Sequence, residues 1–346
     1  MSITKQPEWL NNAVFYEIYP QSFNDTNADG IGDFNGIIEK LDYIRELGCN
    51  AIWINPCFKS PFGDAGYDVE DYYTAAPRYG TNEDLARVFS EAHARGIHVL
   101  LDLVPGHTAV THKWFKESMK AERNEFTDRY VWTNSIWESP EGMGCIRGIS
   151  DRDGSCAVNF FSHQPALNYG FYKPDRDWQQ PMDAPGPIAT REALKDIMRF
   201  WLAMGCDGFR VDMAGSLVKH DEDGKGTIAL WQNIREFLNK EFPDAAMVSE
   251  WGEPDKSLIG GFHIGGPFFS VAPVIRGDLI IFPRDLFPLL EPPQLLVRGN
   301  VQPEFEQDIV MFLQLFFKVI QLRVSTLPIL RLRQFFHPLH QHPAIP

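Results

Sequence analysis

The stretch Gly208–Ala214, which reads GFRVDMA, decides how this chain folds. It follows Gly205, which ends a predicted helix, and Cys206–Ala214 reads as a strand. Because side chains alternate between the two faces of a strand, Arg210 and Asp212 share one face. The other face carries the apolar side chains of Phe209, Val211 and Met213.

A guanidinium and a carboxylate on one face of a buried strand are costly unless they are paired or used. One interpretation is an ion pair that only supports packing. The other is a catalytic carboxylate, because a neighbouring guanidinium favours the ionised form that a nucleophile requires at neutral pH. This stretch alone leaves both interpretations open.

Two other predicted strands also lead into polar residues. Glu250, in VSEWG, follows the strand-like run Ala245–Ser249. Asp102 and His107, in DLVPGH, follow the run Ile97–Leu101. Polar groups at the carboxyl ends of successive strands are how a barrel enzyme builds its site, so the catalytic interpretation gains support.

These stretches resemble the alpha-amylase family of glycoside hydrolases, and most closely its branch of oligo-1,6-glucosidases and alpha-glucosidases. The resemblance covers roughly residues 8–263 and follows the order of the family. The stretches that carry it are VFYEIYPQSF, DTNADGIGDFNGI, GYDVEDY, DLVPGH, QPALNY, GFRVDMA and VSEWG. It implies a (β/α)8 barrel of the TIM type, with an irregular subdomain inserted after the third strand.

Predicted strands alternate with amphipathic helices, which indicates a parallel sheet. Gly36–Leu47 reads as one helix, and a capping box at Thr81–Asp84 opens another. About five strands can be traced, so the barrel looks incomplete. The expected divisions are a first barrel part at 1–105, an inserted subdomain at 106–189, a barrel continuation at 190–263 and a tail at 264–346.

The composition narrows the classes of protein to which the chain can belong. The chain has 346 residues, 44% of them hydrophobic, and a net charge of −14, which argues against nucleic acid and is compatible with a neutral sugar. Five scattered cysteines are typical of reduced thiols, and the N-terminus has no signal peptide. The apolar run Ile309–Phe317 is too short to span a membrane. We therefore expect a cytoplasmic monomer without a membrane partner.

The composition changes near residue 264. The tail contains no Trp, Tyr or Cys and carries a net charge of +1, against −15 for residues 1–263. It shows apolar clusters and many prolines but no strand–helix alternation. Two interpretations stay open: a frame-shifted, chimeric or disordered segment, and an unusual natural extension.

The stretch DTNADGIGD, residues 25–33, places oxygen-bearing side chains at alternate positions. Such a pattern wraps a hard cation, and Gly30 permits the sharp turn. Gly36 stands where a calcium loop has its bidentate glutamate, and a polar turn is the alternative. The resemblance implies a structural Ca²⁺ or Mg²⁺ ion and no organic cofactor. The ligands would be the side chains of Asp25, Asn27, Asp29 and Asp33 and the carbonyl of Ile31.

Sugar-binding residues follow from the resemblance as well. Tyr67 would stack on a terminal glucose and Asp68 would accept hydrogen bonds from its hydroxyls, although a turn with a packed tyrosine is the alternative. His107 would bind the glucose in the cleavage subsite, and Asp102 would support the polar network. A lone histidine is more often structural, and Gly106 replaces the usual asparagine of the family.

The stretch QPALNY, residues 164–169, matches a stretch of the family, and we expect it to support the site rather than to act in catalysis. Ala166 stands where the family usually has an acidic residue.

The chemistry that the resemblance implies needs two carboxylates with opposite tasks. Asp212, kept ionised by Arg210, would attack the anomeric carbon. Glu250, beside apolar Val248 and Trp251, would protonate the leaving oxygen and then deprotonate water, which gives overall retention. The expected substrates are short alpha-1,4- or alpha-1,6-linked gluco-oligosaccharides.

One part of the family pattern is missing. A third carboxylate normally follows a histidine in an NHD motif beyond the glutamate, and the only His–Asp pair here is His220–Asp221, upstream of Glu250. The alternative to an active hydrolase is therefore a catalytically impaired fragment or a non-enzymatic relative.

Overall fold

A computed structural model describes residues 6–140, 142–266 and 279–281 of the chain, all within the unit Met1–Leu290. Most of the predicted tail lies outside the described residues, so neither interpretation of it is tested. The exceptions are residues 264–266 and 279–281, which are strands.

The sheet that carries the fold has six parallel strands, in the order β10-β9-β8-β5-β2-β1, and β11 pairs with β1 in the antiparallel sense. The strands are β1 (Phe15–Ile18), β2 (Ala51–Ile54), β5 (His98–Leu103), β8 (Gly208–Val211), β9 (Ala246–Glu250), β10 (Ile264–Gly266) and β11 (Leu279–Ile281). A (β/α)8 barrel has eight parallel strands, so the described residues confirm the predicted incomplete barrel. A sixth parallel strand, β10, could not be traced in the sequence and pairs with β9.

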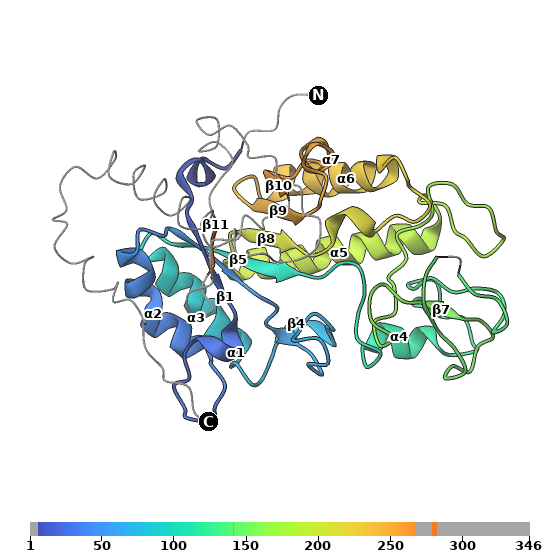
Figure 1. Cartoon of the computed structure of the whole chain (residues 1–346), viewed down its shortest axis with the longest axis horizontal. Coiled ribbons are helices and arrows are strands. Elements are labelled where there is room, and N and C mark those ends of the chain that lie inside the picture. The colour runs from blue at the N-terminus through green and yellow to red at the C-terminus, as the bar shows by residue number, and fades with distance from the viewer. Residues whose placement is uncertain (1–5, 141, 267–278, 282–346) are drawn as a thin grey trace, which may run out of the picture. The chain divides into compact units, whose positions relative to one another are not determined.

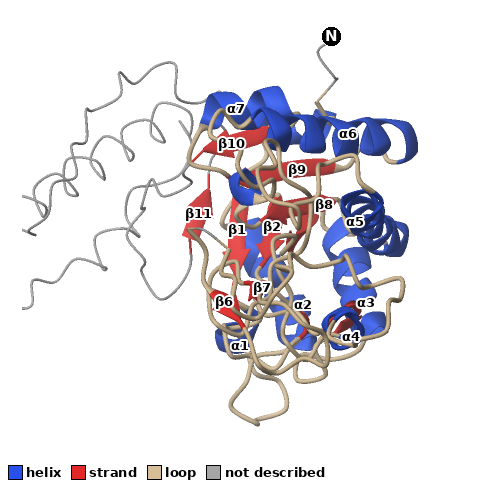
Figure 2. Ribbon diagram, turned by 90° about the vertical axis from the view of Figure 1, so that its right-hand side faces the viewer, coloured by secondary structure: helices blue, strands red, loops and turns tan. Residues whose placement is uncertain are grey.

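Helices connect the parallel strands. Figure 1 shows α2 and α3 beside the first strands and α5, α6 and α7 beside β8, β9 and β10, and Figure 2 shows the same grouping from the side. The helices are η1 (Glu8–Asn12), α1 (Pro20–Phe23), α2 (Phe34–Glu46), α3 (Asn82–His93), α5 (Pro185–Met204), η2 (Ala214–Ser216), α6 (Lys225–Glu241) and α7 (Pro254–Gly260). The capping box at Thr81 opens α3 as predicted, and Gly205 ends α5 with φ 114°.

Side-chain alternation along the strands separates two hydrophobic clusters. Phe209 and Val211 of β8 are fully buried in the larger cluster, which the helices cover. The smaller cluster lies on the other face of the sheet, where Arg210 and Asp102 also lie. Its residues are Leu10, Ala13, Phe15, Ala51, Trp53, Leu100, Ala246, Val248 and Ile264. The sheet thus directs Arg210 toward the barrel interior, as the alternating pattern predicted.

Gly208 allows β8 and β9 to approach each other. Its φ is 145°, which side chains rarely adopt, and a Cβ at this position would overlap the backbone of Ala246. The first residue of GFRVDMA is therefore fixed by the packing of two strands.

Short elements fill the loops that follow β2 and β5. They are β3 (Phe58–Lys59), β4 (Asp71–Ala75), α4 (Lys113–Ser118), β6 (Cys145–Ile146) and β7 (Cys156–Ala157). Between α4 and α5 the described chain has only the two-residue strands β6 and β7. Within the described ranges, no helix combines the length and the apolar character needed to cross a bilayer.

Candidate active site

A cavity of about 490 Å³ opens at the carboxyl ends of the parallel strands, where Asp212 follows β8 and Glu250 ends β9. This volume is in the range of small-ligand sites. The residues that line it are Glu17, Trp53, Asp64, Tyr67, His107, Phe160, Arg210, Asp212, Met213 and Glu250.

Arg210 binds three carboxylates at once. Its Nη1 donates to both oxygens of Asp102, at 2.9 and 3.0 Å, and to Oδ1 of Asp212 at 3.1 Å. Its Nη2 lies 2.9 Å from Oε2 of Glu250. The structure therefore brings these four predicted residues together around a single guanidinium.

The charge balance at Asp212 differs from the expectation. Burial raises the pKa of Asp212 well above its usual range, and the charge of Asp102 adds to the rise, whereas Arg210 lowers it. We expected Arg210 to keep Asp212 ionised. Arg210 does favour the ionised form, but burial and the neighbouring charge of Asp102 oppose it. Such a group of carboxylates can hold a proton, as acid–base chemistry requires.

The strand that carries GFRVDMA is shorter than predicted, since β8 ends at Val211 rather than at Ala214. The chain then turns at Met213, whose φ is 44°, and its backbone N–H donates to Oε2 of Glu250 at 3.1 Å. Met213 consequently lines the cavity instead of joining the apolar face with Phe209. The turn ties the residue after Asp212 to the carboxylate of Glu250.

Tyr67 and Asp102 form one polar network with Trp53. The Tyr67 hydroxyl and Trp53 Nε1 donate to Oδ2 of Asp102, at 3.2 and 3.1 Å. The guanidinium of Arg210 lies over the Trp53 ring, 4.8 Å from its centroid. Asp102 is thus enclosed by hydrogen-bond donors, and its supporting role in sugar binding stays a prediction.

His107 lines the cavity and is held in a defined orientation. Its Nε2 lies 3.2 Å from the carbonyl oxygen of Tyr67, and Nδ1 lies 3.1 Å from the side-chain nitrogen of Asn159. Burial lowers the pKa of His107 to about 4, so the ring is neutral at pH 7. A neutral ring that donates from Nε2 and accepts at Nδ1 satisfies both contacts.

Asp68 is the predicted sugar ligand that the structure does not bring to the cavity. Its fully buried carboxylate accepts hydrogen bonds from the Ser60 hydroxyl and from the backbone N–H groups of Gly63 and Asp64. Asp64 lines the cavity instead, and Gln164 of the QPALNY stretch donates to it at 2.6 Å. A role for Asp68 in sugar binding stays a prediction.

The predicted metal loop has its side-chain oxygens turned toward its own backbone. Asp25 accepts from the N–H groups of Asn27, Ala28 and Gly30, and Asp29 accepts from Ile31. These bonds leave further lone pairs on exposed oxygens, which fits a hard cation.

Asp33, by contrast, caps α2 and binds Thr26. In this described segment Asp25, Asp29 and Asp33 do not gather three oxygens within 4.8 Å. The predicted ligand set of Asp25, Asn27, Asp29, Asp33 and the Ile31 carbonyl therefore stays a prediction.

Sequence reasoning missed Glu17, Trp53, Asp64 and Phe160 as lining residues. Glu17 and Trp53 lie within β1 and β2, so the signal was a polar or aromatic residue in an otherwise apolar strand. Asp64 and Phe160 lie in loops, where no periodicity in the sequence indicates which way a side chain points. Asp221 of the only His–Asp pair caps α6 through the N–H groups of Gly226 and Thr227 and does not line the cavity.

Comparison with protein families agrees with this geometry. Residues 17–263 match the model described as alpha amylase, catalytic domain. The chain is 37% identical over 270 residues to an oligo-1,6-glucosidase of Heyndrickxia coagulans, covering 75% of this chain and 41% of the relative. It is 36% identical over 252 residues to a trehalose-6-phosphate hydrolase of Bacillus subtilis, covering 68% and 42%.

Solved structures show the same likeness. A trehalose-6-phosphate hydrolase of Bacillus licheniformis matches with a TM-score of 0.58 and 33% identity, over 70% of this chain and 45% of that one. A trehalulose synthase variant matches with a TM-score of 0.63 and 30% identity, over 74% and 49%. The chain spans less than half the length of each of these relatives.

Proposed function

The chain belongs to the alpha-amylase family of glycoside hydrolases, and from this premise we propose that its cavity carries out retaining alpha-glucosidase chemistry. The proposed substrates are short gluco-oligosaccharides with alpha-1,4 or alpha-1,6 bonds. The relatives named oligo-1,6-glucosidase support this substrate class.

In the first proposed step, the proton shared by the carboxylates lies on Glu250, an oxygen of ionised Asp212 attacks the anomeric carbon, and the glycosidic bond breaks. Glu250 gives its proton to the leaving oxygen, so the leaving sugar departs as an alcohol. In the second step, Glu250 takes a proton from water while the water oxygen displaces Asp212 from the sugar. Two displacements at one carbon give net retention.

The observation that carries this proposal is the binding of both reacting carboxylates by one guanidinium. Asp212 contacts Nη1 and Glu250 contacts Nη2 of Arg210, and the two carboxyl groups also interact directly. Retaining enzymes hold their carboxyl groups about 5–5.5 Å apart, whereas inverting enzymes leave a wider gap for a water molecule. Two carboxylates on one guanidinium fit the narrower spacing.

The remaining lining residues suit a neutral sugar. Tyr67 and Phe160 offer aromatic surfaces, and His107 and Asp64 offer polar groups at the wall. We propose that these residues orient the terminal glucose against Asp212. Met213, which follows the proposed nucleophile, also lines the cavity.

The test is hydrolysis of maltose, isomaltose and a nitrophenyl alpha-glucoside by the full chain, with the product anomer followed by NMR. We expect alpha-glucose to form first, and Asp212→Asn and Glu250→Gln to abolish its formation. Asp196→Asn, on an exposed helix face, is the matched control and should leave turnover unchanged. Initial release of beta-glucose would contradict the proposal.

We further propose that the loop of Asp25, Asn27 and Asp29 binds Ca²⁺ as a structural ion, with the carbonyl of Ile31 as an additional ligand. Asp33 would act by holding the loop against α2. The loop is outside the cavity lining, so the ion would stabilise the fold and take no part in the reaction.

We also propose that the protein works as a monomer in the cytoplasm. All five cysteines are free thiols, and four of them are buried, which suits a reducing compartment.

A further inference from the structure

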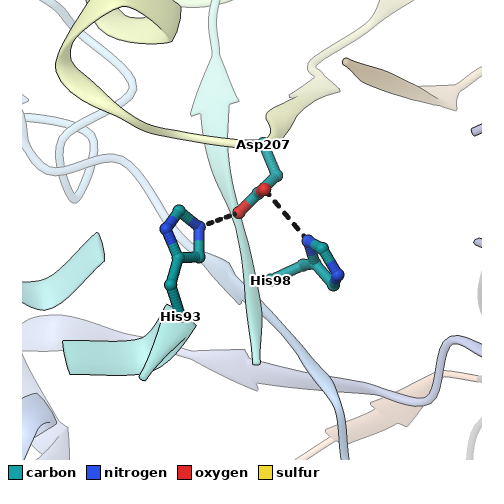
Figure 3. A group of neighbouring side chains, drawn as sticks. All are labelled: His93, His98 and Asp207. Atoms are coloured by element: carbon teal, nitrogen blue, oxygen red, sulfur yellow. Dashed lines mark hydrogen bonds and ion pairs between the residues drawn. The ribbon is translucent and has the colours of Figure 1, made fainter. Parts of the chain in front are cut away.

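Two histidines and a carboxylate meet at the end of the sheet opposite the cavity (Figure 3). His93 ends α3, His98 begins β5, and Asp207 directly precedes β8. The cavity lies at the carboxyl ends of the same parallel strands, so this cluster lies at their amino ends.

Both imidazoles point at the Asp207 carboxylate. His93 Nε2 lies 2.7 Å from Oδ2, and His98 Nδ1 lies 2.9 Å from Oδ1. One nitrogen of each ring and one carboxylate oxygen all lie within 4.8 Å of one another. The Val99 N–H also donates to Oδ2, at 2.7 Å, which fixes the carboxylate against β5.

Neighbouring groups fix the cluster and leave it accessible. The Trp9 ring stacks on His98 with centroids 4.2 Å apart and an interplanar angle of 13°. Trp9 is itself held by a hydrogen bond to the carbonyl of Asp244. The side chains of His93, His98 and Asp207 are 41%, 31% and 17% exposed. An ion from solvent can therefore reach them without opening the core.

We propose that His93, His98 and Asp207 form a binding site for a divalent transition-metal cation, with Zn²⁺ as its representative. Two imidazole nitrogens and one carboxylate oxygen are ligands that suit Zn²⁺, and solvent supplies the fourth position. Hard cations such as Ca²⁺ prefer oxygen ligands, so this site and the loop at Asp25 select different ions.

The size of the cluster agrees with such an ion. Ligand atoms about 2.0–2.2 Å from a tetrahedral Zn²⁺ ion lie roughly 3.3 Å from one another. One ligand atom from each of the three residues lies within 4.8 Å of the other two, so the atoms need to move by at most about 1.5 Å to reach this spacing. Because the three ligands come from α3, β5 and the start of β8, the bound ion would link three elements that the unfolded chain does not hold together.

The first test is equilibrium dialysis of the full chain against Zn²⁺, followed by metal analysis. We expect His93→Gln and His98→Gln each to bind one Zn²⁺ fewer than the parent, or to bind it about tenfold more weakly or worse. His220→Gln, at another partly exposed histidine, is the matched control and should bind as the parent does. The parent and the three variants all contain the tail histidines and Cys145, so Zn²⁺ bound by those residues does not affect the difference between the proteins.

A second test uses the unchanged protein and does not depend on the folding of a variant. Diethyl pyrocarbonate modifies accessible histidines, and peptide mapping locates the modification. We expect Zn²⁺ to protect His93 and His98 and to leave His220 reactive. The proposal would be overturned if the parent and the folded variants bound Zn²⁺ equally, or if Zn²⁺ did not protect His93 and His98. In either case the three residues would form only a hydrogen-bonded cluster.

Discussion

Arg210 and Asp102 face each other across neighbouring strands, and Nη1 of the arginine donates to both oxygens of the aspartate, at 2.9 and 3.0 Å. Both side chains are almost completely buried. The main partner of Arg210 is therefore Asp102 on β5, and the contact with Asp212 is a further branch of the same network. Arg210 is therefore the cation that balances the buried carboxylates at the wall of the cavity.

We predict that Arg210→Gln destabilises the fold strongly at neutral pH. It leaves buried carboxylates without their cation, and breaking a buried ion pair in this way costs about 3–5 kcal/mol. Urea unfolding at pH 7 and pH 5 measures the effect. Without Arg210 the carboxylates protonate more readily in the folded state, so the deficit should shrink at pH 5.

The control for this prediction is Arg199→Gln, which removes an exposed ion pair with Glu241. Exposed pairs contribute roughly 0–1 kcal/mol, so this variant should unfold close to the parent. A small loss in Arg210→Gln, equal to that of the control, would contradict the central role of Arg210.

The second prediction concerns acid sensitivity at His112, which is buried beside α4 and accepts the Trp114 N–H. Burial lowers the pKa of His112 to about 4. The unfolded chain protonates near pH 6.5, so the stabilisation is complete above that value and is lost as the pH falls toward 4. Between pH 7 and pH 5 the loss should be about 2 kcal/mol.

Denaturant unfolding of His112→Asn at both pH values measures this loss, because asparagine keeps an acceptor for the helix but does not titrate. We expect a smaller difference between pH 7 and pH 5 in this variant than in the parent. His220→Gln should keep the full difference. An unchanged pH dependence in His112→Asn would refute the assignment.

The third prediction is a rise in melting temperature with Ca²⁺ and its reversal by a chelator. An ion that binds only the folded loop stabilises the fold by mass action. Asp29→Asn should reduce the rise, and Asp223→Asn, at an exposed pair with Lys225, should not. No shift in the parent, together with no calcium in elemental analysis, would exclude the ion.

The fourth prediction is slow turnover by residues 1–346 as they stand. The third carboxylate of the family pattern has no counterpart motif in this sequence. Loss of one group that stabilises the transition state costs on the order of a hundred- to a thousand-fold in rate. A fusion of residues 1–263 to the C-terminal half of a relative should be faster by such a factor, as kcat on a nitrophenyl alpha-glucoside would show. Equal rates would mean that this chain completes its own site.

The sequence predicted the parts of the fold that depend on local periodicity. Phe209 and Val211 alternate with Arg210, and Thr81 caps α3, because these features depend on neighbours in the chain. The sixth strand, Ile264–Gly266, was missed, since three residues with two glycines show no pattern.

Tyr67 and His107 lie in loops, and the family resemblance predicted them as lining residues. The residue patterns alone predicted only polar groups that follow a recognisable strand. Asp102, Asp212 and Glu250 do so, and they meet as expected. The division of the Arg210 charge could not be predicted, because it depends on distances between strands far apart in the sequence. The burial of Asp68 was missed for a different reason, since it depends on how one short loop without periodicity folds over its own carboxylate.

Asp212 is the residue that we propose to form a covalent bond to the sugar, and trapping that bond tests its role most directly. A 5-fluoro glucosyl fluoride reacts with the nucleophile of a retaining enzyme, and its ring fluorine slows release, so the adduct survives for mass spectrometry. We predict a single glycosyl adduct on the peptide that carries Asp212, and none in Asp212→Asn. An adduct on Glu250, or turnover of the reagent without any adduct on Asp212, would contradict the account.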